Sequence, residues 1–227
     1  MAFMFTHCYL AELVLNKINK KSNVADFDDV DDYYFGAIAP DIRYLDSSGR
    51  DKTHFPFGIN RVLGNATFEK YSKAFVAGYE THLVVDDVWS NNNAGLDESI
   101  YETFNVNVND FVQKFTLYFL VDDYFQSKSN WFFHLGALSS IIRSDRNNML
   151  FDLGFNLAQI ATYKSVAALY LREPGLDTFN VFNFAPTNLD ENLIARILNQ
   201  KPKLSSFLNS FVKVSVEKCR ESLERNL

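Results

Sequence analysis

Apolar residues recur along most of the chain at the spacing of an amphipathic helix. Near the C-terminus the i, i+3, i+4 pattern runs through Leu204, Phe207, Leu208, Phe211 and Val212, and a similar series begins at Phe111. The same spacing predicts further helices over 6–20, 32–39, 66–90, 131–143, 149–172 and 188–200. One short stretch, Phe179 to Phe184, alternates as a strand would. We therefore expect an all-α protein without internal repeats.

Prolines and turn formers separate the helical segments. Pro40, Pro174-Gly175 and Pro202 are expected to stop or divide them, because proline interrupts a helix ladder. Thr187, followed by Asp190 three residues later, resembles a capping box at the start of the segment 188–200. We expect one domain over 1–227, with the candidate site in 1–90 and the helices of 149–227 completing the core.

Composition and charge narrow the functional class. The chain has 227 residues, of which 47% are hydrophobic and 15% aromatic, enough for a sizeable core. Its net charge is −6 and it has no basic block, so we expect no binding to double-stranded nucleic acid, and an anionic substrate would need a local cation. Cys8 and Cys219 form no C-x-x-C motif. With neither a signal peptide nor an uncharged apolar run of transmembrane length, the chain is expected to be a soluble, cytoplasmic protein.

An acidic stretch could be mistaken for a calcium loop. Asp26, Asp28, Asp29, Asp31 and Asp32 lack the glycine and the distal glutamate that an EF-hand needs. Carboxylates are favourable at the positive end of a helix dipole. We therefore expect this stretch to be the solvated start of the helix over 32–39.

The candidate chemistry lies in the first 90 residues. His82 and Asp86 are four residues apart in the helix expected over 66–90, so their side chains share a face and could bind one ion. Asp41 follows the small-residue stretch Gly36-Ala37-Ile38-Ala39-Pro40, and the proline places it in a turn from which its carboxylate can project inward. His54 is expected in a loop. Taken singly, each of these features is compatible with a plain structural role.

Taken together, the motifs resemble the zinc-dependent phospholipase C family, whose fold is shared with the zinc-dependent single-strand nucleases. The resemblance spans about the first 90 residues. It is carried by four stretches, namely His7-x-x-Leu10-Ala11, Phe35-Gly36-Ala37-Ile38-Ala39-Pro40-Asp41, Thr53-His54-Phe55 and Ala77-Gly78-Tyr79-Glu80-Thr81-His82-Leu83-Val84-Val85-Asp86-Asp87-Val88-Trp89.

The resemblance implies a metal centre. Asp41, His54, His82 and Asp86 would surround one zinc ion, and Asp86 would bridge to a neighbouring metal that His7 helps to hold. Imidazoles and carboxylates suit zinc, and another divalent metal is possible. The implied activity is hydrolysis of a phosphate ester, either a small molecule or a phospholipid head group. A metal-activated water would be the nucleophile and Asp41 the base.

The chain departs from the family after the H-x-x-x-D pair. The trinuclear members have a further histidine soon afterwards and then an H-x-x-x-E helix. Here Ser90-Asn91-Asn92-Asn93 stands at the first position, and His134 has Leu138 four residues on. We therefore expect one or two metals. A non-catalytic binding or structural descendant of the same fold is the alternative, whereas an HD-type phosphohydrolase would need an adjacent His-Asp doublet, which the sequence lacks.

Three further residues are candidates for supporting the site. Asp122 and Asp123, at the end of an apolar helix, could accept hydrogen bonds that orient a ligand imidazole, or could form a surface face or a cap. His134 lies in an aromatic stretch, where a core or pocket-lining role is favoured over metal ligation.

Overall fold

The computed structural model of the chain describes residues 4–19, 29–45, 49–54, 70–90, 96–129, 131–145, 147–172 and 186–226, and no strand occurs within these ranges. The all-α prediction is therefore confirmed for the described part, while Phe179 to Phe184 lies outside it. The elements are α1 (Met4–Asn19), α2 (Val30–Ile38), η1 (a 3₁₀ helix, Ala39–Leu45), α3 (Arg50–His54), α4 (Lys73–Ser90), α5 (Leu96–Phe104), α6 (Phe111–Lys128), α7 (Trp131–Arg143), α8 (Asn148–Asp152), α9 (Leu157–Arg172), α11 (Glu191–Asn199) and α12 (Lys201–Asn226).

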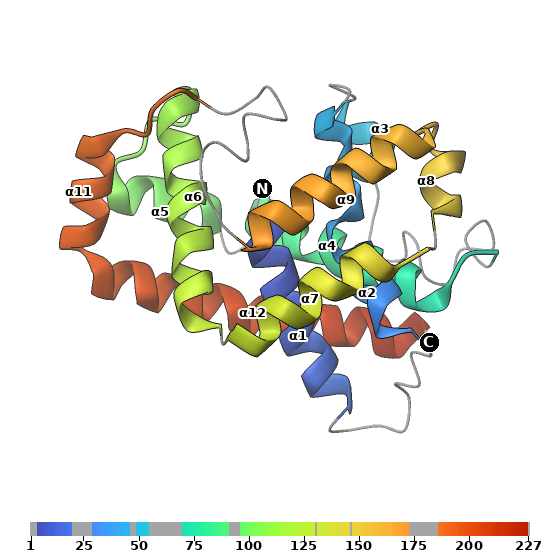
Figure 1. Ribbon diagram of the computed structural model, residues 1–227. Helices are drawn as coiled ribbons and strands as arrows, with labels where there is room; N and C mark the ends of the chain where they lie inside the picture. The colour runs from blue at the N-terminus through green and yellow to red at the C-terminus, as the bar shows by residue number, and fades with distance from the viewer. Residues whose placement is uncertain are drawn as a thin grey trace.

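Helix α4 occupies the centre of this arrangement. It packs most extensively against α2 and then against α12, which runs along much of the length of the molecule (Figure 1). Helix α1 contacts α12, α6, α2 and α4, and α7 packs against α9 and α2. The buried apolar side chains of the described helices form one cluster, so these helices share a core. None of the described helices is both long and apolar enough to cross a bilayer.

Two glycines set the distance between α2 and α4. A Cβ atom at Gly36 would lie 2.1 Å from the carbonyl oxygen of Phe75, and one at Gly78 would lie 2.0 Å from that of Tyr33. Both contacts are with backbone, which cannot rotate away as a side chain could. The two helices therefore approach closely because neither carries a side chain at the crossing.

The segment predicted as one helix over 149–172 is divided. Helix α8 ends at Asp152, and Gly154 has a φ of +86°, a left-handed conformation that favours glycine. Asn156 then starts α9, since its Oδ1 accepts from the backbone N–H of Gln159. The prediction of a single helix was wrong because the apolar period continues across the break.

The start of the C-terminal region also differs from the prediction. The N-cap of α11 is Asp190, which accepts from the backbone N–H of Leu193, so the Thr187 capping box was wrong. Pro202 lies in the first turn of α12, where the missing N–H would have no intrahelical partner, so it marks the predicted division between α11 and α12. The helix predicted over 188–200 is therefore present, but its first residue lies later in the sequence than predicted.

The acidic stretch begins α2 only in part as expected. Asp29 is the N-cap, accepting from the backbone N–H groups of Asp31 and Asp32. Asp32 itself is fully buried and accepts a 2.8 Å hydrogen bond from Ser144 Oγ, so it is not solvated. Asp26 and Asp28 lie outside the described residues.

Candidate metal centre

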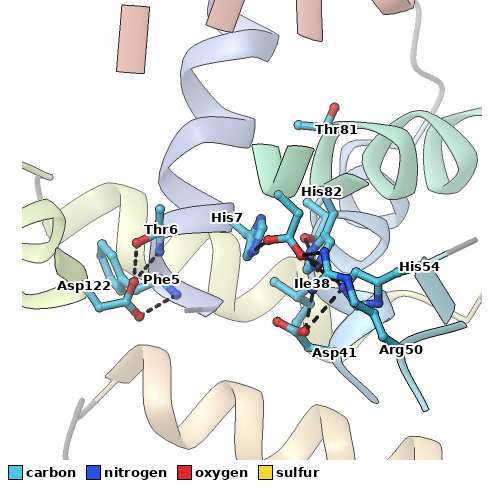
Figure 2. Close-up of polar contacts among 12 residues, drawn as sticks. Phe5, Thr6, His7, Ile38, Asp41, Arg50, His54, Thr81, His82 and Asp122 are labelled. Carbon is cyan, nitrogen blue, oxygen red and sulfur yellow. Dashed lines mark hydrogen bonds and ion pairs between the residues drawn. The ribbon is translucent and has the colours of Figure 1, made fainter. Parts of the chain in front are cut away.

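Side chains from four elements meet at one buried place beside α4 (Figure 2). His7 comes from α1, Asp41 from η1 and His54 from α3, while His82 and Asp86 lie one turn apart on α4. Their exposed fractions are between 0% and 5%. All five residues predicted as metal ligands are thus brought together, although they are spread over 80 positions of the chain.

The candidate ligand atoms lie within a few ångströms of one another. His54 Nε2 is 3.2 Å from His82 Nε2 and 3.2 Å from Asp86 Oδ2. Asp41 Oδ1 is 3.9 Å from the Nε2 atoms of both His54 and His82. His7 Nε2 is 3.4 Å from Asp86 Oδ1. The atoms form two overlapping groups that could each hold an ion, His7 with Asp41 and His82, and His54 with His82 and Asp86.

The outer nitrogens of two imidazoles are held by the fold. His82 Nδ1 lies 2.8 Å from the carbonyl oxygen of Ala37, which can only accept, so Nδ1 carries the proton and Nε2 presents its lone pair to the centre. His54 Nδ1 lies 2.9 Å from Thr53 Oγ1, a hydroxyl that can donate or accept. Such outer hydrogen bonds fix the orientation and tautomer of metal-binding histidines.

Burial favours the neutral imidazoles that a metal requires. The pKa of His82 is held well below 6.5, first by burial and then by the nearby His7. The His7 and His82 rings stack with their centroids 3.7 Å apart, an arrangement that two imidazolium cations would resist. Burial also lowers the pKa of His54, although Asp86 acts in the opposite direction. At neutral pH the imidazoles of His54 and His82 therefore offer lone pairs.

Several buried polar atoms at the centre have no hydrogen-bond partner among the described residues. They are both ring nitrogens of His7, Asp41 Oδ1 and Asp86 Oδ1. A buried polar atom without a partner is costly, and such atoms are uncommon in folded proteins. A divalent cation would satisfy the two carboxylate oxygens and the one His7 nitrogen that carries a lone pair, and the mixture of nitrogen and oxygen donors suits zinc. The residues present therefore fit a metal ion.

The two carboxylates experience opposite environments. Burial raises the pKa of Asp41, and the nearby His7 and His54 only partly offset this effect. Burial acts in the same direction on Asp86, but its contacts with His54 and His7 hold its pKa well below the ordinary value. Asp86 is therefore the firmly ionised member of the pair, and Asp41 the more basic one.

Arg50 adds a positive charge at the edge of the centre. Its Nη2 donates a 2.6 Å hydrogen bond to Asp86 Oδ2, and its side chain is 39% exposed where that of Asp86 is 1% exposed. Arg50 precedes His54 by four residues in α3, so both side chains lie on the same face of this short helix. Sequence analysis missed Arg50, because α3 was expected to be a loop.

No protein-family model, curated protein or solved structure matches this chain. The resemblance to the zinc-dependent phospholipase C family therefore stays an expectation from the sequence motifs.

For the supporting residues, the structure favours the alternatives of a cap and a surface face. Asp122 is buried, and among the described residues it contacts no imidazole. Instead it accepts from the backbone N–H groups of Phe5 and Thr6 at 3.1 and 2.9 Å, and from the hydroxyls of Thr6 and Tyr170. Figure 2 shows this carboxylate beside Phe5 and Thr6 in the first turn of α1, apart from the cluster of histidines. Asp122 thus caps α1 from another helix and fixes the position of His7 indirectly.

Two further candidates were predicted to support the site. Asp123 is exposed on α6, which agrees with the surface face expected as one of its alternatives. His134 belongs to α7, but its side chain falls outside the described part of the structure, as do Asn91, Asn92 and Asn93.

Proposed function

We propose that this protein is a zinc-dependent hydrolase of phosphate esters, related to the phospholipase C family. The supporting observation is that five predicted ligands meet at one buried place, where several of their nitrogen and oxygen atoms lack a hydrogen-bond partner among the described residues. Because three of the five come from elements other than α4, their meeting depends on the whole fold. The substrate would be a small phosphate ester or a phospholipid head group.

His7, Asp41, His54, His82 and Asp86 would hold one or two zinc ions. Bound zinc would lower the pKa of water and offset the charge of the phosphate. Asp41 would accept a proton from the attacking water, because η1 places its carboxylate beside the candidate ligands His54 and His82. His82 and His54 would keep their orientation through Ala37 and Thr53.

Phosphatase assays with matched variants test this proposal. Zinc-loaded protein should hydrolyse p-nitrophenyl phosphate or bis-p-nitrophenyl phosphate. Asp41→Asn should lower kcat by at least about 100-fold, as expected for the loss of a general base. Asp123→Asn removes an exposed carboxylate from α6 and should leave kcat unchanged. Absence of turnover of either ester with any divalent ion would contradict the proposal.

The burial of the centre favours one alternative, a metal site without catalysis. Structural zinc sites are closed, whereas catalytic ones keep a position open to substrate, and all five candidate ligands are at most 5% exposed. In that case zinc would bind and stabilise the fold, but no ester would turn over. The same assay therefore distinguishes the two functions, since zinc binding is common to both and turnover is not.

A further inference from the structure

We propose that Arg50 is the phosphate-binding residue of this site, and that it grips an unesterified oxygen of the phosphate while Asp86 anchors it. This inference extends the proposed function by assigning the recognition of the anionic group to a residue outside the metal ligands. It begins from the position of Arg50, which reaches from solvent to the buried Asp86.

Hydrogen-bond capacity gives the first argument. A guanidinium carries five N–H donors in a fixed planar fork. Among the described residues, Asp86 is the only hydrogen-bond partner of Arg50, and a single Nη2–Oδ2 contact links them. Most of the N–H donors of Arg50 therefore remain available to a ligand. A phosphate with two or three free oxygens matches the planar geometry of these donors.

Charge gives the second argument. The protein carries a net charge of −6, so an anion needs a local cation in order to approach. The neighbouring cations are occupied elsewhere. Lys52 holds its ammonium 3.9 Å from the Phe155 ring centroid, and the guanidinium of Arg43 lies 4.1 Å from the Tyr44 ring centroid. Arg50 contacts a candidate metal ligand directly, through Asp86 Oδ2.

Anchoring gives the third argument. Arg50 lies four residues before His54 on α3, and both contact Asp86 Oδ2, at 2.6 and 3.2 Å. The guanidinium is therefore held beside the candidate ligands rather than free to sweep through solvent. A phosphate bound by Arg50 would have its other oxygens directed toward the centre, so the same contact would recognise the substrate and orient it.

Titration calorimetry with inorganic phosphate tests the assignment, using full-length protein at saturating zinc. Arg50→Gln should weaken phosphate binding at least tenfold, since a charge-assisted hydrogen bond is lost, and Arg50→Lys should give an intermediate affinity. Lys52→Gln is the matched control, because it removes the same charge from the same helix, and its affinity should stay within twofold of wild type. Zinc stoichiometry is measured in parallel by mass spectrometry.

The outcomes separate this inference from the proposed function. Unchanged phosphate affinity in Arg50→Gln overturns the inference, and the proposed function survives if wild type still turns over esters. Tighter zinc binding in Arg50→Gln with unchanged phosphate affinity also overturns it, because Arg50 would then be only a counter-charge to Asp86. A selective tenfold loss in Arg50→Gln in a protein without turnover supports phosphate binding and contradicts catalysis. If Arg50→Gln fails to fold, Arg50→Lys decides by the same comparison with Lys52→Gln.

Discussion

His82 on α4 donates its Nδ1 proton to the carbonyl oxygen of Ala37 on α2, across 2.8 Å. This bond joins the central helix pair to the candidate metal centre. It forms because Gly36 and Gly78 let the two helices approach to backbone contact. The packing of the fold and the orientation of a ligand imidazole therefore have the same origin.

Substitution of Gly78 by alanine should disturb both the packing and the site. The new Cβ would lie 2.0 Å from the Tyr33 carbonyl oxygen, so the helices must separate, and we expect a loss of about 2 kcal/mol or more in the free energy of unfolding. Gly136→Ala in α7 is the control, because nothing lies within 4 Å of its Cβ. That variant should be stabilised by about 0.5–1 kcal/mol through helix propensity. Urea unfolding measures both, and equal effects would contradict the close-packing argument.

In metal-free protein, neutralising each of the two buried carboxylates should change the stability of the fold in opposite directions. Asp41→Asn removes a carboxylate whose ionised form burial disfavours and should stabilise the fold. Asp86→Asn removes the anion that Arg50 and His54 contact and should destabilise it by about 2 kcal/mol. Thermal unfolding in the presence of a chelator measures the signs. Two changes of the same sign would show that the carboxylates do not differ as described.

Asp122 should make stability depend on pH. Burial raises its pKa from 3.8 to about 6, although Thr6 and Tyr170 donate to it. The folded state therefore keeps a proton that the unfolded state has lost, so this contribution to stability is full below pH 4 and disappears as the pH rises through 6. Wild type should lose about 1 kcal/mol more than Asp122→Asn between pH 5 and pH 7.5. Parallel pH profiles for the two proteins would contradict the shift.

The candidate ligand residues were predicted from short local motifs together with the family resemblance that those motifs carry. The H-x-x-x-D spacing places His82 and Asp86 on one helix face, and the small residues before Asp41 indicate close packing. Both patterns involve residues close together in the sequence, so they do not depend on contacts with distant parts of the chain. The C-terminal helices were predicted for the same reason, since the apolar residues of α12 recur at the spacing of a helix.

Other features depend on contacts that no local pattern records. Arg50 becomes part of the site only because α3 docks beside α4, and Asp122 caps α1 from 116 residues away. Helix α5 was missed because only Ile100 and Phe104 are buried among its described side chains, too few to display a period. In these cases the role of the residue or helix depends on tertiary packing, which the spacing of residues in the sequence does not show.

Zinc binding by the intact protein tests the central claim most directly. Native mass spectrometry after zinc loading should show one or two ions per chain, and the melting temperature should rise, because zinc that binds only the folded state adds about 2.7 kcal/mol at 100 times its Kd. His82→Ala should abolish both effects, and Asp123→Asn should retain them. Metal-free wild type that binds no zinc, with an unchanged melting temperature under zinc excess, would contradict the account.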